Sequence, residues 1–318
     1  MIPRLAICFA GVAAFFIAPH FLAEYHMFQI CLIAATALVV LGLVVVTGLA
    51  GQISLAQSAF VGLGGYGSAI LATSCGLPLW ASIPLTAFAV SLAGLVLGQL
   101  TLRISGHYLA LATMAFTAIV QLAFVHSDPV TGGAAGMPVP PFRIFGLALT
   151  TGGQLYYVIL PTTALLFLLV RNVMQSRFGR ALTAIRQSET AAEAMGLDVL
   201  RYKAMAFAAS GFLGAIGGGL LASLSTYLDP AQFGITQSVY FLAVAVVGGM
   251  SSPFGAIIGS ATFILIPDLL QSFQSYLGLV FALLLLGFIV LRPNGLASGV
   301  GLSRYLGLGS LRTAGGRR

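Results

Sequence analysis

A long stretch without any charge constrains this chain more than any other feature. From Met27 to Leu102 the sequence contains no Asp, Glu, Lys, Arg or His. A transmembrane helix needs about 20 apolar residues to cross the hydrocarbon core of a bilayer, so this stretch alone is long enough for about three crossings. In the whole chain 59% of the residues are hydrophobic and 7% are charged, whereas a soluble domain carries about 25% charged residues. These features predict an all-α, polytopic membrane protein.

Apolar runs, separated by polar, Gly or Pro breaks, predict about ten transmembrane helices. The candidate spans lie at about 5–22, 27–47, 54–74, 79–101, 107–125, 154–170, 203–227, 235–250, 254–272 and 275–291. The first run could instead be a secretory signal, although no small-residue cleavage site follows it. The third carries four glycines and is expected to be bent or broken. Residues 1–295 would form one transmembrane domain, and 296–318, rich in Gly, Ser and Arg, a flexible tail.

The distribution of Lys and Arg predicts the orientation. Six basic residues lie in the connection 171–203, and the C-terminal tail is also basic. With ten spans, both of these segments, together with Arg4 and Arg103, fall on one side of the membrane, which the positive-inside rule assigns to the cytoplasm. Both termini would then be cytoplasmic. The loop 126–153 would face outside, with Arg143 as a lone exception. Because the positive charge is explained in this way, no nucleic-acid partner is expected.

The sequence offers no energy source of its own. A P-loop needs Gly-Lys followed by Ser or Thr, but the only lysine, Lys203, follows Tyr202. An ion-coupled carrier usually buries acidic groups in its spans, and only Asp268 lies in one, near its outer end. No His, Cys or acidic cluster indicates an enzyme, so we expect no cofactor and no metal. A transport pathway driven by another subunit is favoured, with an ion-driven carrier or a non-transporting scaffold as alternatives.

The connection 171–203 predicts two short cytoplasmic helices. The first has an apolar face at positions i, i+3, i+4 and i+7, namely Phe178, Ala181, Leu182 and Ile185. Thr190 and Glu193 form a capping-box pattern at the start of the second, which Gly196 could end in the left-handed conformation. A short helix hung between two spans could fit a groove on a partner and transmit its motion. An ordinary helix at the membrane interface is the alternative.

Neutral polar residues mark a candidate transport pathway. They lie in or beside apolar spans, at Gln52, Ser54, Gln57, Ser58, Thr113, Thr117 and Gln121. The last three recur at i, i+4 and i+8, so they share one helix face. These groups could line a pathway for a zwitterionic solute, or they could hydrogen-bond neighbouring helices together. Thr131, Gly132 and Gly133 suit tight turns at the outer mouth of the pathway, with a plain loop as the alternative.

Four stretches resemble one family of transport proteins. SRFGRALTAIRQSETAAEAMGLDVLRYK (176–203) is similar to the cytoplasmic coupling loop of ABC-transporter permeases for branched-chain amino acids, the Liv type. Three further stretches resemble the family's Gly-rich early span, its middle span with a Thr-Gly-Gly loop, and its late Gly-Gly and Pro-x-Gly element. These are GLAGQISLAQSAFVGLGGYGSA (48–69), GHYLALATMAF with DPVTGGAAGM (106–116 and 128–137), and FLAVAVVGGMSSPFGAIIGS (241–260).

The resemblance covers about Gly48 to Gly295, and the long Thr-Gly-Gly loop favours the LivM-like of two sister permeases. It implies coupling to an ATPase through residues that match the family's loop: Arg180, Arg186, Glu189, Ala191, Ala192 and Gly196. One departure is that Thr190 stands before the Ala pair, where the broader ABC-importer motif has Glu.

The resemblance also implies a sister permease subunit, two ABC ATPase subunits and an extracytoplasmic substrate-binding protein, in the cell (inner) membrane. The solute would be leucine, isoleucine or valine, with urea, short amides or aromatic acids as alternatives.

Overall fold

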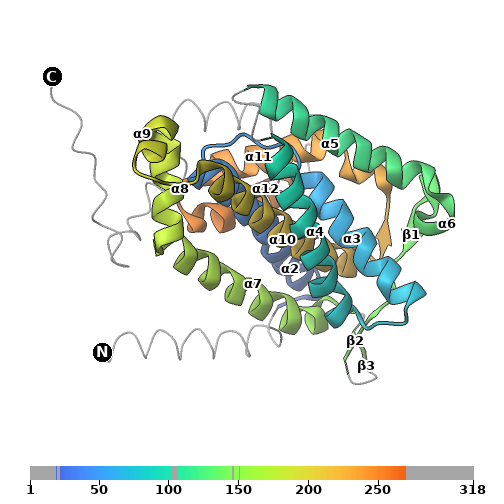
Figure 1. Ribbon diagram of the computed structural model, residues 1–318. Coiled ribbons are helices and arrows are strands. Elements are labelled where there is room, and N and C mark those ends of the chain that lie inside the picture. The colour runs from blue at the N-terminus through green and yellow to red at the C-terminus, as the bar shows by residue number, and fades with distance from the viewer. Residues whose placement is uncertain (1–18, 20–21, 102–106, 145–146, 150, 270–318) are drawn as a thin grey trace, which may run out of the picture.

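The computed structural model describes residues 19, 22–101, 107–144, 147–149 and 151–269. The candidate span 275–291 and the tail 296–318 lie outside these residues, and so does 5–22 apart from residues 19 and 22. Within the described part, helices dominate and lie side by side in one bundle (Figure 1). The α-helices run α2 Glu24–Leu43, α3 Gln57–Ser74, α4 Leu79–Thr101, α5 His107–His126, α6 Asp128–Thr131, α7 Gly152–Gln175, α8 Arg177–Gln187, α9 Glu189–Ala194, α10 Val199–Ser225, α11 Ile235–Gly248 and α12 Pro253–Leu269.

Shorter elements join these helices. A π-helical turn, η1 (Val44–Leu49), continues α2, and two 3-10 turns, η2 (Gly133–Ala135) and η3 (Pro230–Phe233), lie in the loops. Four strands of two or three residues are present: β1 Met137–Pro138, β2 Phe142–Ile144, β3 Leu147–Leu149 and β4 Tyr227–Leu228. The all-α prediction therefore holds for the bundle but not for its loops.

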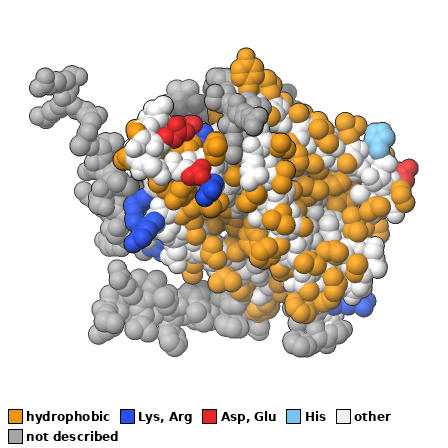
Figure 2. Space-filling view, in the orientation of Figure 1, with side chains coloured by type: hydrophobic (Ala, Val, Ile, Leu, Met, Phe, Trp, Pro, Cys, Tyr) orange, Lys and Arg blue, Asp and Glu red, His pale blue; other side chains and the backbone are white. Residues whose placement is uncertain are grey.

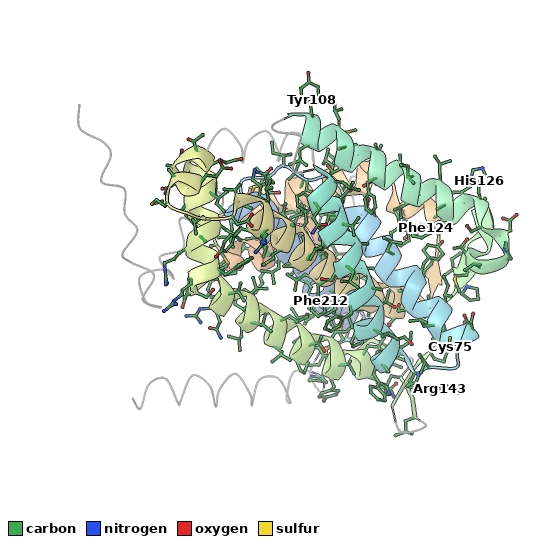
Figure 3. The ribbon with its side chains drawn as sticks, in the orientation of Figure 1. Cys75, Tyr108, Phe124, His126, Arg143 and Phe212 are labelled. Carbon is green, nitrogen blue, oxygen red and sulfur yellow. The ribbon has the colours of Figure 1, made fainter. Side chains whose placement is uncertain are left out.

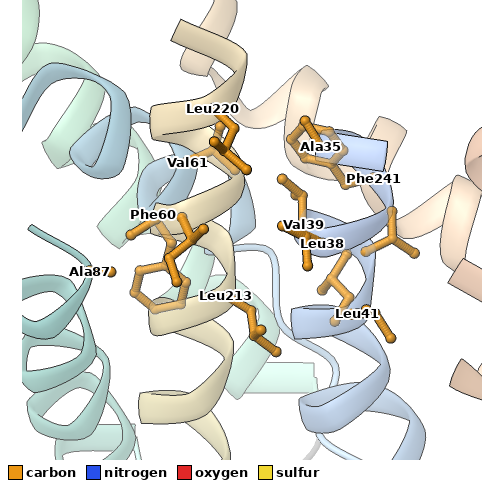
Figure 4. Packing of buried hydrophobic residues seen from close by; sticks show 14 of the residues in the cluster. Ala35, Leu38, Val39, Leu41, Phe60, Val61, Ala87, Leu213, Leu220 and Phe241 are labelled. Atoms are coloured by element: carbon orange, nitrogen blue, oxygen red, sulfur yellow. The ribbon is translucent and has the colours of Figure 1, made fainter. Parts of the chain in front are cut away.

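The long helix α10 forms the centre of the bundle and packs against α2, α3 and α4 (Figure 1). Figure 4 shows Leu213 and Leu220 of α10 among side chains from α2 and α3. Close approach depends on small residues: a Cβ at Gly64 of α3 would overlap the backbone of Ala215 in α10. Helices in lipid associate largely through such tight packing, since burial from water does not drive them together.

The third candidate span was expected to be bent or broken, and this expectation is wrong for the glycine-rich part. Residues 57–74 form one uninterrupted helix, α3. Its glycines are contact points, because a Cβ at Gly62 would meet Phe124 and a Cβ at Gly67 would meet Thr86. The irregular part comes earlier, at residues 50–56, which connect η1 to α3 without helical structure.

Helices α11 and α12 follow each other with a bend of 116° at the turn between them. With 14 residues, α11 is about 21 Å long, shorter than the roughly 30 Å of a hydrocarbon core. By length and composition, the described residues contain five helices able to cross a membrane, or six if this bent pair counts as one span. Each of the eight candidate spans from 27–47 to 254–272 has a helix, whereas ten crossings stay a prediction.

Strand pairing and a side-chain hydrogen bond hold the loops together at one end of the bundle. Strand β1 pairs antiparallel with β4, so that Met137 lies opposite Leu228, and β2 pairs with β3 in a short hairpin. The Tyr227 hydroxyl donates to the carbonyl of Ala135. Figure 3 places His126, Cys75 and Arg143 at this end, and Tyr108 at the opposite end of α5. We refer to this as the outer end, following the predicted orientation.

The surface matches a protein surrounded by lipid. In the face that Figure 2 shows, the middle is covered by apolar side chains, and charged side chains gather near α8 and α9 and at the outer end. Exposed apolar side chains on α4, α5 and α7 include Phe88, Ile119 and Leu165, each more than 60% exposed. Apolar side chains can remain exposed in this way when hydrocarbon is the solvent.

Candidate functional site

In the helix pair α8–α9, the first helix, α8, has the buried face that the sequence predicts. Ala181, Leu182 and Ile185 are buried, and the ring of Phe178 stacks on Tyr202 of α10 with ring centres 5.6 Å apart. The amphipathic face thus packs against the bundle.

The predicted capping box of α9 is wrong, because the helix begins earlier than Thr190. Ser188 is extended and is the N-cap, with its hydroxyl accepting from the amide of Ala191.

As predicted, Gly196 follows the end of α9 in the left-handed conformation, with φ 81°, directly after the C-cap Met195. The amides of Gly196 and Leu197 donate to the carbonyls of Glu193 and Ala192, which is the Schellman arrangement. Of the alanine pair, Ala192 is fully buried against Ile185 and Val199, whereas Ala191 is exposed. Ala192 therefore belongs to a small internal core and cannot touch a partner directly.

One side of α9 exposes small and apolar side chains, although Thr190 and Glu193 of the same helix are exposed as well. Ala191, Ala194 and Met195 are all exposed, Met195 by 70%, and their i, i+3, i+4 spacing places them on one side of the helix. An exposed methionine beside two alanines offers a shallow apolar surface that is suited to a groove on another protein.

Two polar contacts fix this helix pair to the bundle. The Lys203 ammonium of α10 lies 2.7 Å from the Glu189 carboxylate, and Lys203 is 8% exposed. The Arg186 guanidinium donates to the carbonyl of Gly48 in η1. Arg180 remains exposed and donates to the Gln175 carbonyl at the end of α7. A displacement of α8–α9 would therefore also displace α10 and the end of α2.

From η1 the contacts continue to the turn between α11 and α12. A Cβ at Gly48 would overlap the carbonyl of Met250 in that turn, so the two backbones touch. Gly51, with φ 70°, lies beneath Arg186, whose Cγ would be 2.8 Å from a Cβ there. Thus α8, the π-helical end of α2 and the α11–α12 turn form one continuous block.

The polar residues predicted to line a pathway mostly surround the non-helical segment 50–56. The Thr113 hydroxyl accepts from the amide of Leu55 at 3.0 Å, and the Thr117 hydroxyl donates to the Leu55 carbonyl at 2.7 Å. Both threonines are fully buried. Non-helical backbone at membrane depth must find such partners within the protein, and α5 supplies them here.

Gln57 and Ser58 begin α3 at the mid-length of its neighbours. Gln57 donates to the Val39 carbonyl of α2 at 2.7 Å and accepts from Ser210 of α10 at 2.9 Å. Ser58 donates to the Gly234 carbonyl at 2.9 Å, and its amide donates to the Ser238 hydroxyl. Because Ser210 lies near the middle of α10 and Val39 lies within the continuous span Glu24–Leu49 formed by α2 and η1, α3 starts in the interior of the bundle. We call residues 54–58 with these partners the inner polar cluster.

The remaining candidates lie at its edges. The amide of Ala56 donates to the Ser54 hydroxyl at 3.3 Å, Gln121 reaches the Pro230 carbonyl at 3.5 Å, and Gln52 donates to the carbonyl of Ala50 at 3.4 Å. Each candidate thus has a hydrogen-bond partner inside the chain. Their role as pathway lining stays a prediction, and the alternative, bonding between segments, agrees with these contacts.

A cavity of about 330 Å³ lies between α2, α3, α10, η3, α11 and α12, toward the outer end. Sequence patterns did not single it out, because its lining comes from distant segments. Apolar side chains form most of the wall, with Leu32, Val61, Phe241 and Ile264 among them. Polar side chains also face it, at Thr36, Ser225, Gln232, Gln237 and Tyr240. We call it the outer cavity.

The predicted outer-mouth residues form tight turns where α6 ends and η2 begins. Gly132 and Gly133 have φ of 74° and 59°, in the left-handed region that glycine tolerates. The Thr131 hydroxyl is buried and donates to the Ser127 carbonyl at 2.9 Å. The turn geometry is confirmed, and a role in binding a partner stays a prediction.

The bundle of apolar helices, with its charges at the two ends, defines an integral, multi-pass membrane protein. The match to known sequences gives its family. Residues 27–290 match the family described as branched-chain amino acid transport system / permease component, so the chain belongs to that family.

The individual relatives of this chain are also named as transport permeases. The chain is 31% identical over 280 residues to the high-affinity branched-chain amino acid transport system permease protein LivM of Salmonella typhimurium, and 30% identical to that of Escherichia coli. Each alignment covers 80% of this chain and 66% of the relative, which is just under two thirds of its length. The ribose import permease protein RbsC of Bacillus subtilis is 27% identical over 57% of the chain and 56% of the relative. No solved structure matches this chain.

Proposed function

We propose that this chain is the permease subunit of an ATP-driven ABC importer that carries leucine, isoleucine and valine across the cell (inner) membrane. The family match over residues 27–290 is the observation that carries the proposal. The chain itself would catalyse no reaction. ATP would be hydrolysed by two partner subunits on the cytoplasmic side, a sister permease would complete the pathway, and a binding protein would deliver the solute from outside. Both termini would be cytoplasmic.

The helix pair α8–α9 is the proposed contact with the ATPase. Its exposed face of Ala191, Ala194 and Met195 would fit a groove, and Gly196 would set the length of α9. Arg186 and Glu189 would transmit the motion, since they join the pair to η1 and to α10. Movement of this block would tilt α2 and the α11–α12 turn, exposing the pathway to each side in turn.

An uptake measurement tests the function as a whole. Proteoliposomes would contain this chain with its partner subunits, with ATP inside, the binding protein outside and an ionophore present. We expect labelled leucine uptake that needs both ATP and this chain. Uptake abolished by the ionophore despite ATP would instead indicate an ion-driven carrier. Uptake of ribose in place of leucine would keep the mechanism and change the solute, an alternative suggested by the name of the ribose import relative.

A substitution on α9 tests the proposed coupling. Ala191→Arg places a long charged side chain on the exposed face, so we expect leucine uptake to fall about tenfold or more while ATP hydrolysis continues, a loss within the usual range of coupling energies. Ala191→Ser is the matched control and should retain uptake. Ala192→Arg is unsuitable, because Ala192 is buried and the charge would disrupt the fold. Coupled uptake at the normal rate in Ala191→Arg would exclude this face as the contact.

A further inference from the structure

Four of the polar side chains that face the outer cavity differ from those of the inner polar cluster. Within the described part of the chain, the side chains of Thr36, Ser225, Gln232 and Gln237 make no hydrogen bond. Thr36 as a whole is 5% exposed and lines the cavity, whereas Ser225 and Gln232 are exposed. Buried polar groups are nearly always hydrogen-bonded. A ligand in the cavity could supply the missing partner.

Two helix ends of opposite polarity meet at this cavity. Ser225 is the last residue of α10, and the carbonyls of a final turn carry partial negative charge. Gln237 lies in the first turn of α11, whose N-cap Gly234 provides no side-chain cap, and the amides of a first turn carry partial positive charge. The cavity therefore borders the C-terminal end of α10, with its partial negative charge, and the N-terminal end of α11, with its partial positive charge.

The cavity lining also limits the chemistry of a ligand. No Asp, Glu, Lys, Arg or His lines the cavity among the described residues, so a ligand with a net charge would lack a counter-ion. Apolar side chains cover most of the remaining wall, including Leu32, Val61 and Phe241. The volume of about 330 Å³ lies at the small end of the range for ligand pockets. These features together fit a small molecule without net charge, which carries one positive and one negative group at one end and an apolar group at the other.

We propose that the outer cavity binds one zwitterionic amino acid with an apolar side chain, its carboxylate at the first turn of α11 and its ammonium at the last turn of α10. Discontinuous helix ends bind charged solute groups in other membrane transporters through the same backbone dipoles. The choice of an amino acid as the solute rests on the proposed transport function, whereas the place of the site rests on the cavity alone. The permease would thus hold the solute itself, on the outer side.

Protection of a cysteine tests the site directly. Ser225→Cys is introduced together with Cys8→Ser and Cys75→Ser, because Cys75 is exposed whereas Cys31 is buried. The full chain is purified with its associated subunits in lipid nanodiscs and labelled with a hydrophilic maleimide, with leucine or analogues present. We expect leucine to slow labelling, by about elevenfold at ten times its dissociation constant. Leucinol, which lacks the carboxylate, 4-methylpentanoate, which lacks the ammonium, and ribose should protect far less.

Two further substitutions, each added to the Ser225→Cys chain, test whether the protection by leucine arises at the cavity. Gln237→Leu removes a polar group at the α11 end and should raise the half-protecting leucine concentration severalfold. Thr162→Val is the control, because the Thr162 hydroxyl bonds only within its own helix, to the Val158 carbonyl; protection should be unchanged. Absence of leucine protection, or equal protection by leucinol, overturns the proposal.

Uptake by the same preparations separates this proposal from the transport function. ATP-dependent leucine uptake without protection of Cys at position 225 would overturn the cavity site and leave the function standing. Protection by leucine without any uptake would support the site and overturn the transport role.

Discussion

The inner polar cluster and the outer cavity are both polar regions inside an apolar bundle, but they differ in how their polar groups are satisfied. In the cluster, Gln57 and Ser58 bond to three other segments of the chain at 2.7 to 3.0 Å. In the cavity, Thr36 and Gln237 face an open volume and make no hydrogen bond to the described residues. The polar groups of the inner polar cluster therefore hold segments of the chain together, whereas those of the outer cavity are available to a solute.

This difference shows why polar residues in a membrane span are ambiguous when seen only in sequence. The expected pathway lining and the residues of the cavity share the same side-chain chemistry, neutral amides and hydroxyls. What separates them is the presence of a partner across the bundle. Matched substitutions in the two regions can test the distinction.

The largest effect on stability is expected for Gln57→Leu. Removing this amide leaves the Val39 carbonyl and the Ser210 hydroxyl without their bonds, at about 1 kcal/mol each and about 2 kcal/mol in total. Gln232→Leu is the matched control in the cavity, and we expect its stability to stay within about 0.5 kcal/mol of the parent. Equilibrium unfolding in mixed micelles measures both. Equal destabilisation by the two substitutions would remove the distinction between the regions.

A second pair compares threonines of nearly identical burial. Thr117→Val removes the bond to the Leu55 carbonyl and should destabilise the chain by about 1 kcal/mol. Thr36→Val removes a hydroxyl without a partner and should leave stability unchanged or slightly raised, while leucine protection at the cavity weakens. The same unfolding measurement, with the cysteine-protection assay alongside, checks this pair. A larger loss of stability in Thr36→Val would mean that its hydroxyl is structural.

The smallest effect on stability is expected for Gln121→Leu. Gln121 is half-buried, and its bond to the Pro230 carbonyl is long at 3.5 Å, so its loss should cost about 0.5 kcal/mol or less. Initial rates of leucine uptake sharpen the comparison here. Uptake that falls severalfold in a stable Gln121→Leu variant would support pathway lining by the α5 face. Unchanged uptake would place Gln121 with the structural residues.

Local patterns predicted the parts of the molecule that depend on local physics. The apolar face of α8, with Leu182 and Ile185, and the left-handed Gly196 are confirmed, because periodicity and backbone freedom are properties of a short segment. The cap of α9 was missed since Ser188 and Thr190 are both plausible caps, and only the backbone conformation decides between them. Gly62 and Gly67 were interpreted as breaks because the sequence does not show the side chains that pack against them.

Features that join distant segments were not predictable in this way. The contact of Met250, in the turn between α11 and α12, with Gly48 joins segments that lie far apart in the sequence. The outer cavity combines Thr36 with Ser225 and Gln237, residues that no spacing rule connects. The neutral polar residues near Ser58 were recognised, but their partners Ser210 and Ser238 were not, because single serines in long apolar helices carry no distinguishing signal.

The interior start of α3 also has a consequence for the order of biosynthesis. Ser58 obtains its partner Ser238 only after a further 180 residues have been made, which takes about 10 to 40 s at usual rates of translation. During that interval the amide and hydroxyl of Ser58 lack the partners that Ser238 and Gly234 supply, and unpaired polar groups are unfavourable in lipid. We expect α3 to wait at the membrane surface or within the insertion machinery until α11 arrives. Chains truncated before Ile235 should therefore be degraded, even though most of their helices are complete.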